Sequence, residues 1–547
     1  MNINKMIYIA LEYHRNGNLA QAEILYKKIL KKQPDNVDIL HMLGVICSAK
    51  GDFDSAIRLI KKALNIKPSN YHAFYNLANI YRDNKRYNEA IDCYQKAIDY
   101  YPDFVDALYN LGILYQEIGR LNDAIECYKK AIQTNPGLFN LHFNLGNALY
   151  DKGFIEEAIK SYRNAIRLSP DFTAAYYNLA NIFKERDQND EAIAFYKKAL
   201  QLDPGNIDVY HNIGILLHNR GLIEEAIRYY KKAISLNYNL AEIHFDLAFA
   251  LLSIGNFEEG WREYQWRRKL KSHSINFAEP EWEGITNEGR LLLYEEQGYG
   301  DTIQFARYCD IVSNKGIKVI LLCSEPLKSI MKNVNGITEV YNYKEQLPEF
   351  DFHCPLSKLP LIFRTDLDNI PSNIPYISIT PDLFSFWKNK INSERHFKVG
   401  LAWAGNPEHR NDKNRSFPFE KYLPLFSLKN IKFYSLQIGP SSLRKINKPE
   451  GIDIIDLTED IKDFSDTAAL IENLDLVISV DTAIVHLAGA LGKKVWTLLP
   501  FSPDWRWMLN RDDSPWYPTM KLFRQTKSGD WDTVIKMVYS ELSAYTK

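Results

Sequence analysis

The chain has 547 residues, of which 46% are hydrophobic and 25% are charged, and its formal net charge is -1. This length exceeds what one hydrophobic core accommodates and predicts roughly two to four domains. The balanced charge disfavours nucleic acid or an anionic membrane as the main partner, and no apolar run reaches the ~20 residues of a membrane span.

The amino-terminal stretch predicts a chain without a leader. Its sequence, MNINKMIYIALEYHRNGN, continues directly into a helical repeat and does not read as a signal peptide. The six cysteines are far apart and lack metal-ligand spacing, which is typical of buried thiols in a reducing compartment. We therefore expect a cytoplasmic protein.

The first half of the chain repeats with a period of 34 residues. An alanine recurs at this interval, with an aromatic column four residues later and a proline column twelve residues later. The alanines are Ala22, Ala56, Ala90, Ala124, Ala158, Ala192 and Ala226, and Gly260 takes the eighth position. This is the tetratricopeptide pattern. It predicts eight helical hairpins over residues 1–274, stacked into an α-solenoid with a concave groove.

A polar column is expected to face that groove. It consists of Asn76, Asn110, Asn144, Asn178 and Asn212. An amide side chain can donate to and accept from a peptide backbone, so the column is a candidate peptide-binding ladder. Asparagine is also common at this position of tetratricopeptide hairpins. The pattern therefore favours the alternative in which these side chains face solvent and bind no peptide. Binding of a protein or peptide by the whole groove is the broader expectation.

The eighth repeat departs from the pattern and is expected to end the solenoid. Trp261 and Trp266 follow Gly260 closely, and terminal repeats are typically atypical in sequence because they cap the stack. We read residues 275–288 as a linker. Beyond residue 289, buried-strand runs alternate with helical stretches, which predicts parallel sheets. We expect two Rossmann-like α/β halves, residues 289–385 and 386–547, that face a cleft.

The first chemical motif is the stretch EQGYGDTIQFAR, which begins at Glu296. Gly298 and Gly300 let the backbone turn sharply between a strand and a helix and let a ligand approach closely. The motif is neither a dinucleotide fingerprint nor a phosphate-binding P-loop. It places Asp301 at the mouth of the sheet and at the start of a helix. Because aspartate caps helices well, the spacing alone favours a capping role.

The second motif, VDTAIVHLAGALG, directly follows a predicted strand. Asp481 or Thr482 would cap a helix whose first amides form an anion site suited to a diphosphate. His486 is one turn further along and can reach the same region, although a capped helix with a satisfied histidine fits equally. Between the two motifs, the loop HRNDKNRS carries Lys413 and Arg415. These cations either neutralise phosphate or belong to a solvated loop.

These motifs resemble the heptosyltransferase-type glycosyltransferases of family 9, which have the GT-B fold. The resemblance rests on GYGDTIQFARY, HRNDKNRSFP and VDTAIVHLAGALGKKVWTLLP, and it covers roughly residues 275–547. The stretch PDWRWMLNRDDSPWYPTMKLFRQ is similar to a segment of bacterial proteins that fuse tetratricopeptide repeats to that domain. The overall layout is also similar to the O-linked N-acetylglucosamine transferases.

The resemblance implies inverting, metal-independent sugar transfer from a nucleotide-diphosphate donor, with no other cofactor. Carried over by motif, Asp301 corresponds to the general base. The donor-diphosphate positions correspond to Asp481, Thr482, Ala483, Ile484 and His486. Arg415 fits the phosphate-binding lysine of the family best, with Lys413 as the alternative. An arginine is a departure from the family pattern, because a planar fork replaces a point charge.

A tryptophan-rich segment, residues 503–516, adds a candidate pocket. Trp505 would stack on a base or sugar and Arg506 would support a phosphate. The other candidate pocket residues are Gly298, Gly300 and Gln304. Tryptophans at this density are more typical of a core or an interface, and we favour that interpretation.

Three functions are compatible with these features. We favour a glycosyltransferase that acts on a protein or peptide acceptor held by the repeats. The alternatives are a saccharide or lipopolysaccharide-type acceptor, with the repeats as an assembly scaffold, and an inactive interaction scaffold. The joint presence of four motif residues argues against the inactive scaffold; they are Asp301, Asp481, Thr482 and His486.

Overall fold

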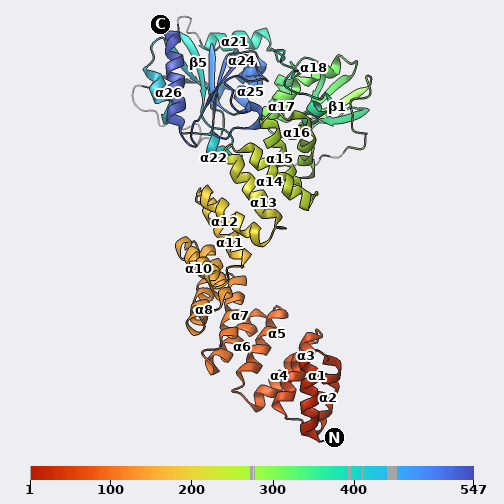
Figure 1. Ribbon diagram of the computed structural model, residues 1–547. Coiled ribbons are helices and arrows are strands. Elements are labelled where there is room, and N and C mark those ends of the chain that lie inside the picture. The colour runs from red at the N-terminus through yellow and green to blue at the C-terminus, as the bar shows by residue number, and fades with distance from the viewer. Residues whose placement is uncertain are drawn as a thin grey trace. The chain divides into compact units, whose positions relative to one another are not determined.

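The computed structural model describes residues 2–270, 275, 277–391, 396–409, 411–439 and 452–546 (Figure 1). It forms two compact units, Met1–Asn206 and Ile207–Lys547. Residues 271–274 of the predicted repeats and Arg410 of the predicted cationic loop lie outside the described residues. The predicted domain limits at residues 274, 288 and 385 stay predictions.

The first unit is a stack of helical hairpins, which confirms the predicted tetratricopeptide solenoid in this half of the chain. The recurrent alanines of each second helix are fully buried, so the paired helices approach closely. The helices are α1 (Ile3–Arg15), α2 (Leu19–Lys32), α3 (Val37–Ala49), α4 (Phe53–Ile66), α5 (Tyr71–Asp83), α6 (Tyr87–Tyr100), α7 (Val105–Glu117), α8 (Leu121–Thr134), α9 (Phe139–Asp151), α10 (Ile155–Leu168), α11 (Thr173–Glu185) and α12 (Asn189–Leu202).

The second unit begins with the last hairpins of the repeat array. These are α13 (Ile207–Asn219), α14 (Ile223–Leu236), α15 (Ala241–Ser253) and α16 (Phe257–Tyr264), followed by the 3-10 turn η1 (Gln265–Lys269). Gly260 stands where the other repeats have alanine, and a Cβ added there would lie 2.7 Å from Leu252 Cδ2. The glycine therefore allows closer packing in the terminal hairpin than alanine would.

A parallel sheet with strand order β3-β2-β1-β4 follows. Its strands are β1 (Arg290–Tyr294), β2 (Lys318–Leu322), β3 (Ile337–Tyr341) and β4 (Phe352–Pro355). The helices of this region are α17 (Tyr299–Ala306), α18 (Tyr308–Ser313), α19 (Glu325–Met331), η2 (Leu356–Lys358) and α20 (Leu359–Ile362). The chain order reverses between β1 and β4, which is the type of position where open α/β sheets bind ligands.

A second parallel sheet has the order β10-β9-β8-β5-β6-β7. Its strands are β5 (Phe397–Ala402), β6 (Ile431–Ser435), β7 (Ile454–Asp456), β8 (Leu476–Val480), β9 (Val495–Leu499) and β10 (Met520–Arg524). The surrounding helices are α21 (Pro381–Ile391), α22 (Asp412–Arg415), η3 (Phe419–Ser427), η4 (Thr458–Asp460), α24 (Phe464–Glu472), α25 (Ala483–Ala490), η5 (Trp505–Trp507), α26 (Trp531–Leu542) and η6 (Ser543–Thr546). Its switch point lies between β5 and β8.

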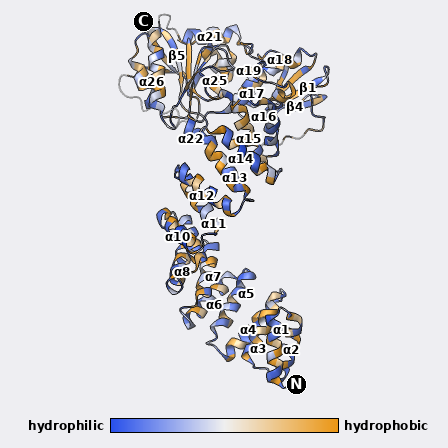
Figure 2. Ribbon diagram, viewed as in Figure 1, coloured by the Kyte–Doolittle hydropathy of each residue, from blue (hydrophilic) through white to orange (hydrophobic). Residues whose placement is uncertain are grey.

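The core of the second unit is continuous from the last repeat into the sheets. One buried cluster includes Trp261 of α16, Leu291 of β1, Ile303 of α17 and Leu487 of α25. Figure 2 shows hydrophobic residues in the strands and mixed hydropathy along the helices. The last hairpin is therefore part of the hydrophobic core that supports the sheets.

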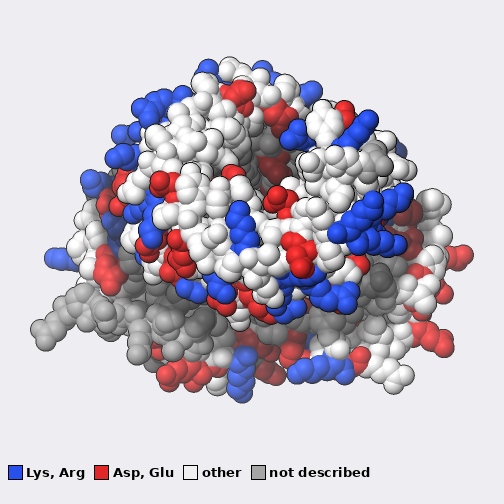
Figure 3. Space-filling model, turned by 90° about the horizontal axis from the view of Figure 1, so that it is seen from below, with Lys and Arg blue, Asp and Glu red and all other residues white. Residues whose placement is uncertain are grey.

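The charged surface agrees with the near-neutral composition. Lysine and arginine are interspersed with aspartate and glutamate on the face shown in Figure 3. Among the described residues, no helix combines the length and apolar character needed to cross a membrane.

Candidate functional site

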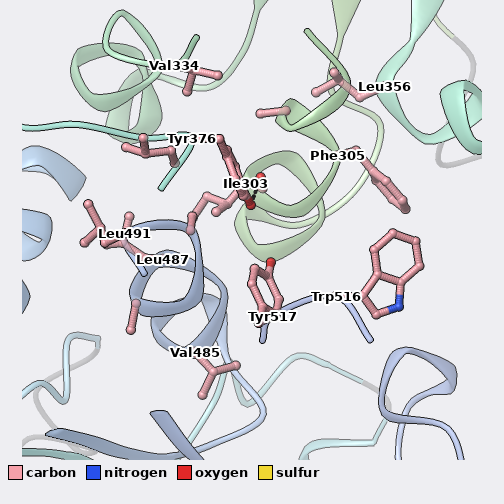
Figure 4. Packing of buried hydrophobic residues seen from close by; sticks show 14 of the residues in the cluster. Ile303, Phe305, Val334, Leu356, Tyr376, Val485, Leu487, Leu491, Trp516 and Tyr517 are labelled. Atoms are coloured by element: carbon pink, nitrogen blue, oxygen red, sulfur yellow. Dashed lines mark hydrogen bonds between the residues drawn. The ribbon is translucent and has the colours of Figure 1, made fainter. Parts of the chain in front are cut away.

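The two predicted motifs meet where α17 packs against α25. α17 follows the carboxyl end of β1, and α25 follows the carboxyl end of β8. A Cβ added to Gly300 would lie 2.8 Å from His486 Cδ2 and 3.6 Å from Ala483 Cα, so only glycine permits this approach. Figure 4 shows Ile303 of α17 and Leu487 of α25 among the buried hydrophobic residues of one core. The amino-terminal ends of α17 and α25, one from each sheet region, therefore lie together.

Asp301 is the third residue of α17 and has both carboxylate oxygens engaged. Oδ2 accepts a hydrogen bond from the Gly298 N–H at 3.1 Å, so the carboxylate caps the first turn of α17. Oδ1 accepts from Nη2 of Arg506. The side chain is 23% exposed. Burial raises the pKa of Asp301, and the Arg506 guanidinium opposes that rise. The carboxylate both caps the helix and faces the site.

Arg506 lies on η5 and connects that turn to α17. Its Nε donates to Gln304 Oε1 at 2.6 Å and its Nη1 donates to Asp504 Oδ1 at 2.7 Å, while Nη2 bonds Asp301. The side chain is buried. Sequence reasoning found Arg506 but missed Asp504, because a carboxylate two residues away carries no motif signal.

The amino terminus of α25 is the second part of the candidate site, opposite α17. Thr482 is its N-cap, and its Oγ1 accepts from the Ile484 N–H at 3.3 Å. Asp481 precedes it, and burial and then the charge of Asp504 raise the pKa of Asp481. Arg415 and Arg506 oppose that rise. Two guanidinium groups therefore act electrostatically on this helix end.

His486 lies one turn into α25 in a buried position. Its Nδ1 is 3.0 Å from the Tyr517 hydroxyl, and its Nε2 is 4.0 Å from Asp481 Oδ1. Burial lowers its pKa well below the ordinary value, and the nearby arginines lower it further. The imidazole is therefore neutral near pH 7 and can offer a hydrogen bond without adding charge.

The two candidate phosphate-binding cations of the loop, Arg415 and Lys413, differ in their exposure and contacts. Arg415 of α22 is 14% exposed, and its Nε lies 3.3 Å from Asp412 Oδ1. Its guanidinium packs on Gly405, where an added Cβ would lie 2.5 Å from Nη2. The charge of Arg415 also lowers the pKa of His486, whereas Lys413 has an exposed side chain. Arg415 is thus the less exposed of the two loop cations and the one whose charge acts on Asp481 and His486.

Trp505 is packed within the protein core. It is 1% exposed and meets Trp261 edge-to-face, with ring centroids 5.2 Å apart. Trp516 adds a second edge contact at 5.9 Å. A ring packed in this way offers no open face to a ligand, so its position fits the interface alternative. Trp507, which sequence reasoning did not single out, instead lies parallel to the His486 ring at 5.4 Å.

The last repeat also holds the turn that precedes Asp301. The Tyr264 hydroxyl donates to Gln297 Oε1 at 2.7 Å. Arg267 forms a fully buried ion pair with Glu296, and the Ser357 hydroxyl donates to the same carboxylate at 2.6 Å. No repeat-period signal predicts these bonds, since they occur only where the repeats end.

The asparagine column has a different environment. Asn110 Nδ2 donates to the Tyr75 hydroxyl at 2.9 Å, and Asn144 Nδ2 donates to the Tyr109 hydroxyl at 3.1 Å. Asn76 bonds His41, Asn178 donates to Asn147, and Asn212 occupies the same register on α13. A hollow of about 310 Å³ in the first unit is lined by Gln116, Asn147, Tyr150, Asp151, Tyr162, Asn178, Asn181 and Ile182. The amides of the first unit therefore link neighbouring repeats, and a ladder for peptides stays a prediction.

Family models match both parts of the chain. Models described as TPR repeat match residues 78–119, 146–187 and 180–221, and models described as tetratricopeptide repeat match residues 105–138 and 207–240. A model of anaphase-promoting complex, cyclosome, subunit 3 matches residues 15–97. The model of glycosyltransferase family 9 (heptosyltransferase) matches residues 462–537. That stretch contains β8, α25 and η5 but neither Asp301 nor Arg415.

Individual relatives match the chain over part of its length. FlbA from Caulobacter vibrioides is 26% identical over 291 residues, which are 48% of this chain and 48% of FlbA. The chain thus spans about half the length of that curated relative. The crystal structure of MamA is 31% identical and covers 30% of this chain and 97% of MamA, with a TM-score of 0.29. YrrB, described as a TPR protein with an unusual peptide-binding site, is 21% identical over 34% of this chain and 96% of its own, with a TM-score of 0.31.

Proposed function

We propose that this protein transfers a sugar from a nucleotide-diphosphate donor to a hydroxyl group of a protein or peptide acceptor. The observation that carries the proposal is the packing of the Asp301 turn against the amino terminus of α25, with Arg506 bonded to Asp301 and the charge of Arg415 acting on Asp481. The family 9 match over residues 462–537 supports glycosyl transfer as the reaction type. In this proposal the two parallel sheets are the halves of a GT-B fold.

The reaction would be a single displacement. The acceptor oxygen forms a bond to the anomeric carbon of the sugar, and Asp301 takes the hydroxyl proton. The bond from that carbon to the diphosphate oxygen breaks, and its electron pair leaves with the diphosphate. Because attack and departure occur on opposite faces, the anomeric configuration inverts.

Burial suits Asp301 to the role of base. An ordinary aspartate is a weak base near neutral pH, and the low-polarity surroundings raise the pKa of this carboxyl. A higher pKa makes proton transfer from a hydroxyl less unfavourable.

The leaving diphosphate would bind at α25. The backbone amides of residues 482–484 lie at the amino terminus of α25. This is the positive end of the helix dipole, which attracts phosphate oxygens. Arg415 and Arg506 add two cations, and neutral His486 adds a hydrogen-bonding group. These groups provide the electrostatic stabilisation for which other transferases use a divalent ion, so we propose metal-independent transfer.

The repeats would present the acceptor. Tetratricopeptide arrays bind protein partners in their grooves, and the last hairpin is built into the core beside the site. A protein or peptide acceptor therefore fits this architecture better than a small saccharide. The column containing Asn110 and Asn144 remains a proposed contact surface for such a chain.

The test uses fluorescence, because all ten tryptophans lie at or after residue 261 and report only on the second unit. Thermal unfolding is followed with UDP, GDP, ADP and CDP, each with and without EDTA. A ligand at 100 times its dissociation constant stabilises by about 2.7 kcal/mol. We expect one diphosphate to raise the melting temperature in the presence of EDTA.

Two loop variants provide a matched comparison. Arg415→Met removes the cation whose charge acts on Asp481 and His486, and Lys413→Met removes an exposed cation two residues away. We expect Arg415→Met to abolish the ligand-induced shift and Lys413→Met to retain it. Absence of a shift with every diphosphate would contradict the proposed donor site.

A further inference from the structure

Arg506 bonds the proposed base and belongs to η5, whose Trp507 stacks on His486 of α25. Its guanidinium bonds Asp301, and its charge also influences the titration of Asp481 and His486 at α25. A carboxylate that is paired with a guanidinium is a poor proton acceptor, because the ion pair stabilises its ionised form. The arrangement seen here therefore restrains Asp301.

We propose that Arg506 is a donor-operated latch on Asp301. In the arrangement described here, Nη2 of Arg506 holds the carboxylate. When a diphosphate occupies the amino terminus of α25, a phosphate oxygen displaces the carboxylate from Nη2 and Asp301 becomes available to the acceptor hydroxyl. This inference rests on the proposed function and adds an order of events to it, with donor binding before base activation.

The other two hydrogen bonds of Arg506 keep its guanidinium in position during such an exchange. Nη1 remains on Asp504 and Nε remains on Gln304, so the guanidinium plane stays in place while one anion replaces another at Nη2. A guanidinium is a planar fork that bonds carboxylates and phosphates with similar geometry. The exchange therefore replaces one anion by another at the same edge of the group.

The backbone around Arg506 is held in place, which confines the exchange to the side chain. Met508 ends η5 with a φ of 52°, a conformation that side-chain-bearing residues rarely adopt. Arg524 holds this turn by donating to Met508 O at 3.0 Å and to Arg511 O at 2.7 Å. A fixed turn with one exchangeable contact is suited to a latch.

Release has a chemical consequence for Asp301. Burial already raises the pKa of this carboxyl, and the guanidinium is the largest influence that opposes the rise. When the carboxylate loses its bond to Nη2, the opposing influence weakens and the carboxylate becomes more basic. Base strength thus increases only after the leaving group is bound, and binding is coupled to proton uptake.

The test measures binding of inorganic pyrophosphate, which represents the diphosphate without a base or sugar. Isothermal calorimetry is performed with the wild type, Arg506→Met, Asp301→Asn and the double variant. We expect Arg506→Met to weaken binding tenfold or more. Asp301→Asn should tighten binding several-fold, because Arg506 no longer has to leave a partner. In the Arg506→Met background, Asp301→Asn should have little effect.

A matched control and a proton count sharpen the result. Arg511→Met removes an arginine of the same segment that pairs with exposed Asp513, and it should leave pyrophosphate affinity unchanged. Calorimetry in two buffers of different ionisation enthalpy gives the protons taken up on binding. The wild type should take up more protons than Asp301→Asn. If Arg506→Met does not fold, Arg506→Lys takes its place, and the proton count decides the outcome.

The outcomes separate the two proposals. If pyrophosphate binds the wild type with the same affinity as Arg506→Met, or Asp301→Asn acts equally in both backgrounds, the latch is wrong and the donor site stands. If proton uptake is equal in the wild type and Asp301→Asn, the latch is also wrong. If pyrophosphate binds neither the wild type nor Asp301→Asn, the proposed donor site fails and the latch fails with it.

Discussion

Substitution of Arg267 by methionine tests how strongly the last repeat is joined to the proposed site. Arg267 and Glu296 form an ion pair in which both side chains are almost fully buried, at 0% and 1% exposure. Arg267 Nη1 also donates to Tyr264 O at 2.8 Å. Arg267→Met keeps much of the side-chain length and removes only the charge and its hydrogen bonds.

The expected cost follows from the charge that is left behind. Removal of one partner of a buried ion pair typically costs about 3–5 kcal/mol, because the remaining ion is desolvated without compensation. Here Glu296 keeps the Ser357 hydroxyl at 2.6 Å, and Arg268 Nε lies 3.7 Å from its other oxygen. These contacts place the expected loss near the lower limit, at about 3 kcal/mol.

A double variant separates lost attraction from stranded charge. In Arg267→Met combined with Glu296→Leu no buried ion remains, so the free energy of unfolding should return to within about 1 kcal/mol of the wild type. Urea unfolding followed by tryptophan fluorescence gives these values for the second unit alone. A loss below about 1 kcal/mol for Arg267→Met, or a double variant as unstable as the single one, would refute the reasoning.

Three further predictions use the same fluorescence assay. Trp261→Ala removes a buried ring and its N–H bond to Thr365 O at 2.9 Å, and should cost about 3–5 kcal/mol. Half-buried Trp266→Ala should cost clearly less; equal losses would contradict this. Gly300→Ala places a Cβ 2.8 Å from His486 and should cost about 1–3 kcal/mol, and an unchanged stability would show that α17 and α25 adjust freely. The pKa of His486 is lower in the folded protein than in the unfolded chain, so the unfolded chain binds the proton first as the pH falls. The free energy of unfolding should therefore decrease below about pH 6.5, by up to 1.36 kcal/mol per pH unit. His486→Gln should remove that part of the slope, and an identical slope would disprove the assignment.

The repeat half was predictable because one contact is rebuilt at every period. Ala90 and Ala124 occupy equivalent buried positions, so the spacing alone specifies helices that approach closely. The parallel strands were predictable for a related reason, since short apolar runs such as residues 318–323 are buried on both faces. Strand order was not predictable, because pairing of β5 with β8 depends on contacts distant in sequence.

The site was only partly predictable. Glycine at position 300 indicated a close approach, but nothing in the motif shows that the partner is His486. Arg506 and Asp301 are 205 residues apart, and no local pattern relates them. The family motif favoured Arg415 over Lys413, but the difference in their exposure and the influence of Arg415 on His486 appear only in the folded chain.

The buried polar contacts of the second unit explain why repeat and site are expected to respond together. Arg267 holds Glu296, the next residue Gln297 bonds Tyr264, and the Gly298 N–H donates to the carboxylate of Asp301. The segment from Glu296 to Asp301 is thus fixed at one end by the last repeat and at the other by Arg506. Because hydrogen-bonded groups in a low-polarity interior are costly to leave unpaired, loosening one end should loosen the other. Arg267→Met should therefore weaken the hold of Arg506 on Asp301 as well as the fold, and hydrogen exchange at residues 298–303 should rise more than in β8. Equal exchange increases in both segments would mean that Arg267 acts on global stability alone.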